Sequence, residues 1–250
     1  KYQPFMATYI TLLKNPIREI ILTISFKENI EISILDEFKK TAIISNVFPI
    51  SNKGFRTRLI PPQHVEEIPP KADILHDGFV LSNEQKTKTL NARIGSLSFH
   101  IVNGYDSFIN LSKELNVYWQ ELVKLNGDLT VNSLNVRYVN FFELELGDDI
   151  NELLNIRTTD PFGNSSLNKF TNLKFIYPHH SNISATIVTT GGKIDDKSGL
   201  ILDIMLNKVL ETPENTAFDF DEFSDLRDAK NDIFFKCITE KTIKKLNHEN

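Results

Sequence analysis

Five polar side chains on strand-like segments have the types and spacing that could carry chemistry: Glu19, Arg137, Tyr138, Asn140 and Asp203. An arginine can hold a carboxylate or a phosphate through two parallel hydrogen bonds. A carboxylate can act as an acid, a base or a metal ligand. Arg137 is the most unusual of the five, because it lies in the otherwise apolar segment VNSLNVRYVNFFELEL. A charge in such a segment must be paired or exposed at an edge, since an isolated buried ion is too costly.

The alternation of residues 131–146 predicts a strand and assigns each side chain to a face. Tyr138 and Asn140 fall on the stronger apolar face, and Arg137 falls on the other. In residues 15–26 the same alternation places Glu19 opposite the apolar face. If the two strands are neighbours, Glu19 and Arg137 could form a bidentate pair, and Asp203 is a second candidate partner. Three roles for the arginine stay open: a structural ion pair, an anion clamp, or simple exposure.

Other candidate motifs give weaker signals, and the sequence predicts neither a metal nor a cofactor. The tandem His179 and His180 would point to opposite faces of a strand, so exposed turn histidines are favoured over a metal site. The stretch TTGGKIDDKSG, residues 189–199, lacks P-loop spacing and favours a hairpin loop. Cys237 lies on the apolar stripe of an expected helix, where a buried and unreactive thiol is expected.

Composition excludes several classes of protein. The 250 residues contain 28 Lys and Arg against 33 Asp and Glu, a net charge of −5, so the charge expected of a duplex-binding protein is missing. A local basic patch is still compatible with that total. One cysteine indicates a reducing compartment. No apolar run is long enough to span a bilayer, and the first residues lack a signal-peptide pattern, so we expect a cytoplasmic protein without membrane contact.

The order of the expected elements predicts an α+β fold with two related halves, residues 1–128 and 129–250, packed as one unit. Each half reads as a strand, a short helix, two or three antiparallel strands and a long helix. We therefore expect two antiparallel sheets, each with helices packed on one face. The strand of Glu19 opens the first half, and the strand of Arg137 opens the second.

Four segments carry a resemblance: NPIREIILTISF at residues 15–26, FP at 48–49, VRYVN at 136–140 and LILDI at 200–204. In order and spacing they resemble a sporadically distributed prokaryotic family of uncharacterised proteins of about this length. Asn15 and Ile20 depart from its usual proline and alanine. The resemblance implies that the five polar residues belong to a common framework. Sporadic occurrence suits a bacterial accessory system, such as phage defence or a toxin and antidote pair.

Three functions follow as hypotheses. The leading one is a non-catalytic binding or interaction protein, because two antiparallel sheets would create a large concave surface and no catalytic set is recognisable. The acidic tail of the chain favours a basic protein as its partner. The first alternative is an enzyme or nucleotide-ligand binder that uses Arg137 with Glu19 or Asp203. The second is an RNA-binding protein with duplicated ferredoxin-like halves, which the net charge disfavours. The sequence leaves homo-oligomer formation open.

Overall fold

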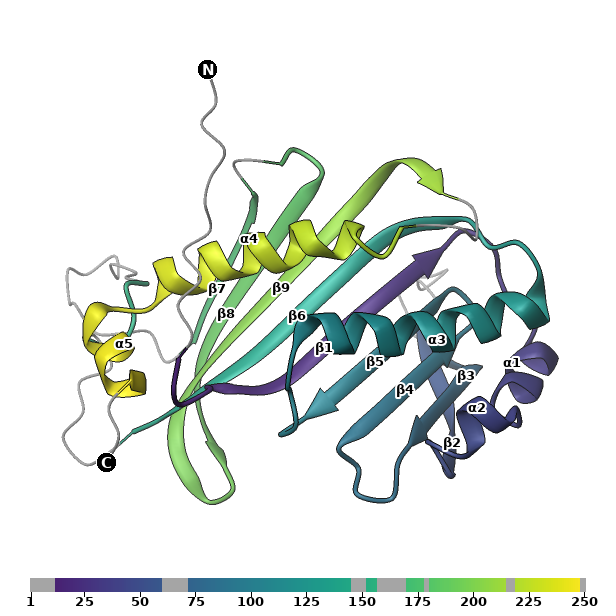
Figure 1. The fold of residues 1–250 in the computed structure, drawn as a ribbon, viewed down its shortest axis with the longest axis horizontal. Coiled ribbons are helices and arrows are strands. Elements are labelled where there is room, and N and C mark those ends of the chain that lie inside the picture. The colour runs from purple at the N-terminus through teal and green to yellow at the C-terminus, as the bar shows by residue number, and fades with distance from the viewer. Residues whose placement is uncertain are drawn as a thin grey trace, which may run out of the picture.

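The structure is a computed structural model that describes residues 12–59, 72–144, 152–156, 170–177, 180–214 and 219–247. In these residues nine strands form one antiparallel sheet (Figure 1). The strands are β1 (Ile17–Phe26), β2 (Ile50–Leu59), β3 (Ala72–Ser82), β4 (Lys88–Arg93), β5 (Ser96–Val102), β6 (Val131–Glu143), β7 (Phe170–Ile176), β8 (Ile183–Ile194) and β9 (Lys197–Glu214). Five helices accompany them in the same residues: α1 (Ile32–Phe38), α2 (Ala42–Ser45), α3 (Phe108–Asn126), α4 (Glu222–Cys237) and α5 (Glu240–Asn247).

The strand order is β2-β3-β4-β5-β1-β6-β9-β8-β7, with β1 and β6 at the centre. The predicted α+β class is confirmed, but the prediction of a separate sheet in each half is wrong. The antiparallel pairing of β1 with β6 joins both sets of strands, and this removes the edge that each separate sheet would have exposed. The relation between the halves and their boundary at residue 128 stay predictions.

The central strands alternate as their sequences predict. On β1, Ile20, Leu22 and Ile24 are fully buried, and on β6 Leu134 and Val136 are too. These side chains face the helices, as the period of two along each strand requires. The residues between them face the other side of the sheet, which we call the open face because the two long helices α3 and α4 lie on the opposite side (Figure 1).

Two long helices cover the inner face of the sheet. In α3, Ser107 caps the first turn by accepting a hydrogen bond from the Asn110 backbone N–H at 3.2 Å, and Gly127, with φ 85°, ends the helix. Apolar residues at spacings of three and four form its buried stripe, as expected of an amphipathic helix. The predicted stripe of α4 is also confirmed, because Phe223, Leu226, Ile233 and Cys237 are all buried.

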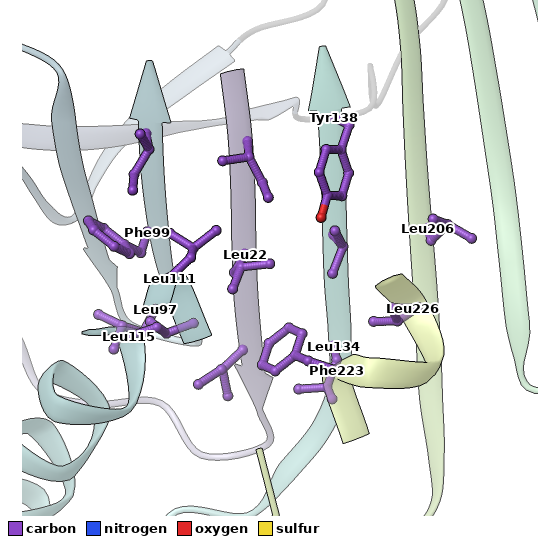
Figure 2. Close-up of a cluster of buried hydrophobic side chains, with 14 of the residues drawn as sticks. Leu22, Leu97, Phe99, Leu111, Leu115, Leu134, Tyr138, Leu206, Phe223 and Leu226 are labelled. Carbon is purple, nitrogen blue, oxygen red and sulfur yellow. The ribbon is translucent and has the colours of Figure 1, made fainter. Parts of the chain in front are cut away.

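The core lies between the sheet and these helices (Figure 2). Leu22 of β1 and Leu134 of β6 lie at its middle, flanked by Leu111 of α3 and by Phe223 of α4. All four come from separate elements, so the centre of the core forms only when both halves of the chain are in place.

The stretch 189–199 forms a hairpin, as predicted. β8 ends at Ile194 and β9 begins at Lys197, so the turn consists of Asp195 and Asp196. Their φ values of 50° and 62° are those of a two-residue type I′ turn, in which aspartate is well tolerated. Of the histidine pair, His179 lies outside the described residues.

We expect Leu22→Ala to lower the free energy of unfolding by about 2 to 5 kcal/mol, because it opens a cavity at a fully buried central position. Met205→Ala is the matched control, since Met205 is 38% exposed on the same sheet and should cost less than about 1 kcal/mol. Urea unfolding of both variants measures the difference. Equal losses would contradict this placement of the core.

Candidate functional site: a basic cleft at the end of the central strands

The structure divides the five predicted residues between the two faces of the sheet. Glu19, Arg137 and Asp203 lie on the open face. Tyr138 and Asn140 lie on the inner face and are almost completely buried. The five therefore do not form one cluster, and they form two polar groups separated by the sheet.

Arg137 pairs with Asp203, the second of its two predicted partners. Its Nε donates to both carboxylate oxygens at 3.0 Å, and its Nη2 donates to Oδ2 at 2.6 Å. The pair spans β6 and β9, and the Arg137 side chain is 42% exposed whereas that of Asp203 is 16% exposed. The hydrogen bonds to Asp203 raise the pKa of Arg137 above its ordinary value. This carboxylate occupies the Nε and Nη2 side of the guanidinium and balances its charge, so Arg137 attracts a ligand anion less strongly than an unpaired arginine would.

Glu19 binds His100 of β5 rather than Arg137. The Nδ1 of His100 lies 3.2 Å from Glu19 Oε1, and its Nε2 lies 2.9 Å from Asn91 Nδ2. An amide donating to Nε2 requires the proton on Nδ1, so His100 donates to Glu19. That hydrogen bond lowers the pKa of Glu19 against the opposing effect of burial, and the charge of Arg137, and that of His100 when it is protonated, act in the same direction as the hydrogen bond. Both ring nitrogens are engaged, so the imidazole is not free to act as a base.

Tyr138 and Asn140 are part of the buried core on the inner face of the sheet. Asn140 donates from Nδ2 to the Leu202 carbonyl at 3.0 Å, which satisfies part of a buried amide. Burial raises the pKa of Tyr138 well above its ordinary value, so its phenol stays neutral. The Tyr105 ring meets it edge-on, with centroids 6.2 Å apart.

Uncharged hydrogen-bonding side chains form a row across the open face. Cross-strand pairing places them side by side on six neighbouring strands: Asn91, Ser98, Thr23, Asn135, Asn207 and Ser184. Thr23 donates to Ser98 at 2.9 Å within this row. The row and the two pairs beside it, Arg137 with Asp203 and Glu19 with His100, make this part of the open face polar.

A cleft with a different electrostatic character lies where β1 begins and β6 ends. Its volume is about 730 Å³, and its walls come from the residues before β1, the end of β6, the start of β9 and helix α5. Six cationic side chains line it, Lys14, Arg18, Lys197, Lys241, Lys244 and Lys245, against one acidic side chain, Glu143. This basic cleft departs from the net charge of −5, so it is a local anion-attracting site on an acidic protein.

Some of these lysines are already paired. Lys197 lies 2.8 Å from Glu143, and Lys241 pairs with Glu152. Lys244 has no partner among the described residues. Positive charge therefore remains in the cleft after the pairs are counted.

Arg18 owes its position to a β-bulge. In the pairing of β1 with β6, Ile17 lies opposite Asn140 and Glu19 lies opposite Val139, so Arg18 is the extra residue between them. Its guanidinium carbon lies 5.7 Å from the centroid of the Phe141 ring. Its Nε is buried and has no hydrogen-bond partner among the described residues. A bulge commonly re-aims a side chain next to a site, and here it turns an arginine into the basic cleft.

The position of the Phe141 ring, which contacts Arg18, requires a glycine on the neighbouring strand. A Cβ at Gly199 would lie 2.3 Å from the Phe141 ring, so only glycine lets the ring lie directly on β9. Phe141 is 3% exposed as a result. The guanidinium is thus positioned before any ligand arrives, which lowers the entropic cost of binding.

Sequence reasoning missed this cleft. The apolar pattern of β1 predicts a regular strand, because a bulge leaves no mark in a pattern of apolar residues. A signal was present in TEKTIKKLNHEN, where Lys241, Lys244 and Lys245 recur at helical spacings of three and four. That spacing places the three cations on one side of α5.

Other chemistries find little support in the described residues. No group of three or more histidine, cysteine, aspartate and glutamate side chains gathers there as a metal site would require. Burial raises the pKa of the Cys237 thiol to about 12, which keeps it protonated. None of the described helices has the length and apolar character needed to cross a membrane.

Comparison of the chain with models of protein families and with curated proteins finds no match. The resemblance to an uncharacterised prokaryotic family stays a prediction.

We expect Arg137 and Asp203 to be coupled in a double-mutant cycle by about 1 kcal/mol, limited by the partial exposure of the arginine. Arg137→Ala, Asp203→Ala and the double variant would be compared by urea unfolding. The coupling should shrink in molar salt because part of the pair is exposed. Additivity within about 0.3 kcal/mol would show that the pair does not stabilise the strands.

The lowered pKa of Glu19 predicts that the stability of the protein depends on pH. Its folded pKa lies below the ordinary 4.5, so its contribution is complete above that pH and is lost as the pH falls through the lower folded value. Glu19→Gln should be less stable than the parent at neutral pH, and the gap should close in acid. Urea unfolding across this pH range measures the gap. A gap that does not change with pH would exclude this linkage.

Proposed function

We propose that the protein binds a phosphorylated small molecule, of the nucleotide class, in the basic cleft. The observation that carries the proposal is the position of Arg18 on the Phe141 ring, with a buried Nε that has no hydrogen-bond partner among the described residues. Arginine recognises phosphate through planar donors, and lysines supply further point charges. The cleft volume lies within the range of about 300 to 1,000 Å³ that is usual for ligand pockets.

The charge count supports a ligand with more than one negative group. Six cationic side chains face one carboxylate, and two of the lysines have carboxylate partners, Glu143 and Glu152. Arg18 and Lys244 have no carboxylate partner among the described residues, so a ligand with a single negative group would leave one of these two charges uncompensated. A diphosphate or triphosphate matches these two charges better.

This proposal agrees with the leading hypothesis of a binding protein. It also keeps the anion-binding arginine of the first alternative but assigns that role to a different residue. Arg18 takes the role that the sequence suggested for Arg137, whose charge is balanced by hydrogen bonds from Nε and Nη2 to Asp203. A basic protein partner and a place in a bacterial accessory system stay predictions, as do the other hypotheses for RNA binding and catalysis.

A duplication remains part of the proposal at the level of the fold. We propose that the two halves are related, and the strand order supports this. β1 is followed outward by β5, β4, β3 and β2, and β6 is followed outward by β9, β8 and β7. Each of these sets precedes one of the two long helices in the chain.

Titration calorimetry with ATP, GTP and inorganic triphosphate tests the proposed function. We expect at least one of these probes to bind, with an affinity that falls as salt rises, because the contacts are charged. Arg18→Ala should weaken binding about 10-fold, equivalent to about 1.4 kcal/mol. Lys244→Ala should weaken it less, since one point charge is lost from several.

Lys124→Ala is the matched control, because Lys124 is 76% exposed on α3 and lies outside the cleft. It should leave the affinity unchanged. The proposal fails if none of the three probes binds at millimolar concentration, or if Arg18→Ala binds as well as the Lys124→Ala control. Tighter binding of a short single-stranded RNA, with a steeper salt dependence, would replace the nucleotide proposal with the RNA alternative.

A further inference from the structure

A second cavity lies on the helix side of the sheet, next to the basic cleft but different in chemistry. It has a volume of about 310 Å³ and lies between α4, the residues before β1, the segment before α3 and the end of β6. Among the described residues, the two cavities have Asn15 and Pro16 in common. Its walls contain much apolar surface, from Leu12, Phe234 and Phe235 among others.

Lys230 of α4 lines this cavity and is 8% exposed. Its Nζ lies 4.0 Å from the centroid of the Tyr138 ring and 5.9 Å from that of Phe234. No carboxylate of the described residues lies within ion-pair distance of it. Two other lysines near it in the fold show the contrast: Lys208 binds Glu222 and Asp225, and Lys236 binds Asp232.

The charged and titratable groups around Lys230 do not compensate its charge. Arg227, one turn earlier on α4, is a like charge and lies 2.9 Å from Asp228. Asp106 is exposed in the segment before α3, and it accepts a hydrogen bond from Asn110 at 2.7 Å. Burial keeps both tyrosines of the cavity region, Tyr105 and Tyr138, neutral by raising their pKa.

A buried ammonium without a counterion is costly, and only part of that cost is offset by contact with an aromatic face. Burial lowers the pKa of Lys230 to about 7, with a further contribution from Arg227. The amine is therefore divided between its charged and neutral forms near neutral pH. A ligand that supplied a negative charge would provide the counterion that the described residues do not provide.

We propose that this cavity binds a small amphipathic carboxylate, whose acid group pairs with Lys230 and whose apolar body packs against Phe234 and Phe235. One buried cation matches one negative charge. The acidic Asp106 in the same wall disfavours a doubly charged group. Asn140 and Asn231 also line the cavity and provide amide groups near the ligand.

Binding of such a ligand should take up protons. The carboxylate favours the ammonium form, so complex formation raises the pKa of Lys230, and a proton is drawn from solvent whenever the free amine was neutral. Above about pH 7 the affinity should therefore fall, approaching 10-fold per pH unit once the free amine is fully neutral. This dependence is measurable on the unchanged protein.

Titration calorimetry with hexanoate, benzoate and 3-phenylpropanoate, each beside its uncharged amide, tests the proposal. We expect at least one acid to bind at least about 10-fold more tightly than its amide. Titrations in two buffers of different ionisation enthalpy should show proton uptake above neutral pH. Lys230→Met keeps the length of the side chain and should abolish the preference for the acid.

Lys236→Met is the control variant, because Lys236 is on the same helix and is 59% exposed. It should retain the preference. The proposal is overturned if no acid binds at millimolar concentration, if acid and amide bind equally, or if Lys230→Met keeps the preference for the acid. Borohydride trapping of hexanal on Lys230, without carboxylate binding, would also overturn it in favour of a carbonyl-reactive lysine. The comparison of each acid with its amide and the pH series both use the unchanged protein. They therefore test the proposal even if Lys230→Met does not fold.

Discussion

The antiparallel pairing of β1 with β6 is the constraint on which the rest of the structure depends. It places Ile21 opposite Arg137 and Leu22 opposite Val136, and it thereby assigns every polar residue of both strands to a face. A shift of one residue would send Arg137 into the core and expose Tyr138. The same pairing contains the bulge at Arg18, so the register of two strands fixes the geometry of the basic cleft as well.

Much of this arrangement could be predicted from alternation, and the rest could not for identifiable reasons. The faces of β1 and β6 follow from a period of two, and the stripe of α3 follows from spacings of three and four. The partner of Arg137 depends on strand order, which a single sequence does not contain. Glu19 and Asp203 both lie opposite Val139, from the two sides of β6, so each is diagonal to the arginine. Asp203 holds it by three hydrogen bonds, whereas Glu19 is held by His100.

The candidate site was harder to predict than the fold because its residues depend on irregular features. Arg18 lies at a bulge, and its ring support depends on Gly199, which is distant in sequence. Lys230 sits within a stripe of buried residues on α4, where an apolar side chain would be the usual choice. Its lack of a partner becomes visible only when Tyr105, Tyr138 and the residues before β1 are brought around it. In both cases the signal is a cation whose neighbours fail to neutralise it.

The strand order also has a consequence for how the chain folds. Five of the eight strand pairs join consecutive strands of the chain, so their loops are closed early and at low entropic cost. The central pair instead joins residues such as Ile21 and Arg137, which are far apart in sequence. Contacts of that kind slow folding, because loop closure precedes any gain from packing. Until β1 meets β6, neither cavity exists, so we expect ligand-binding ability to appear only with the last, slowest folding step.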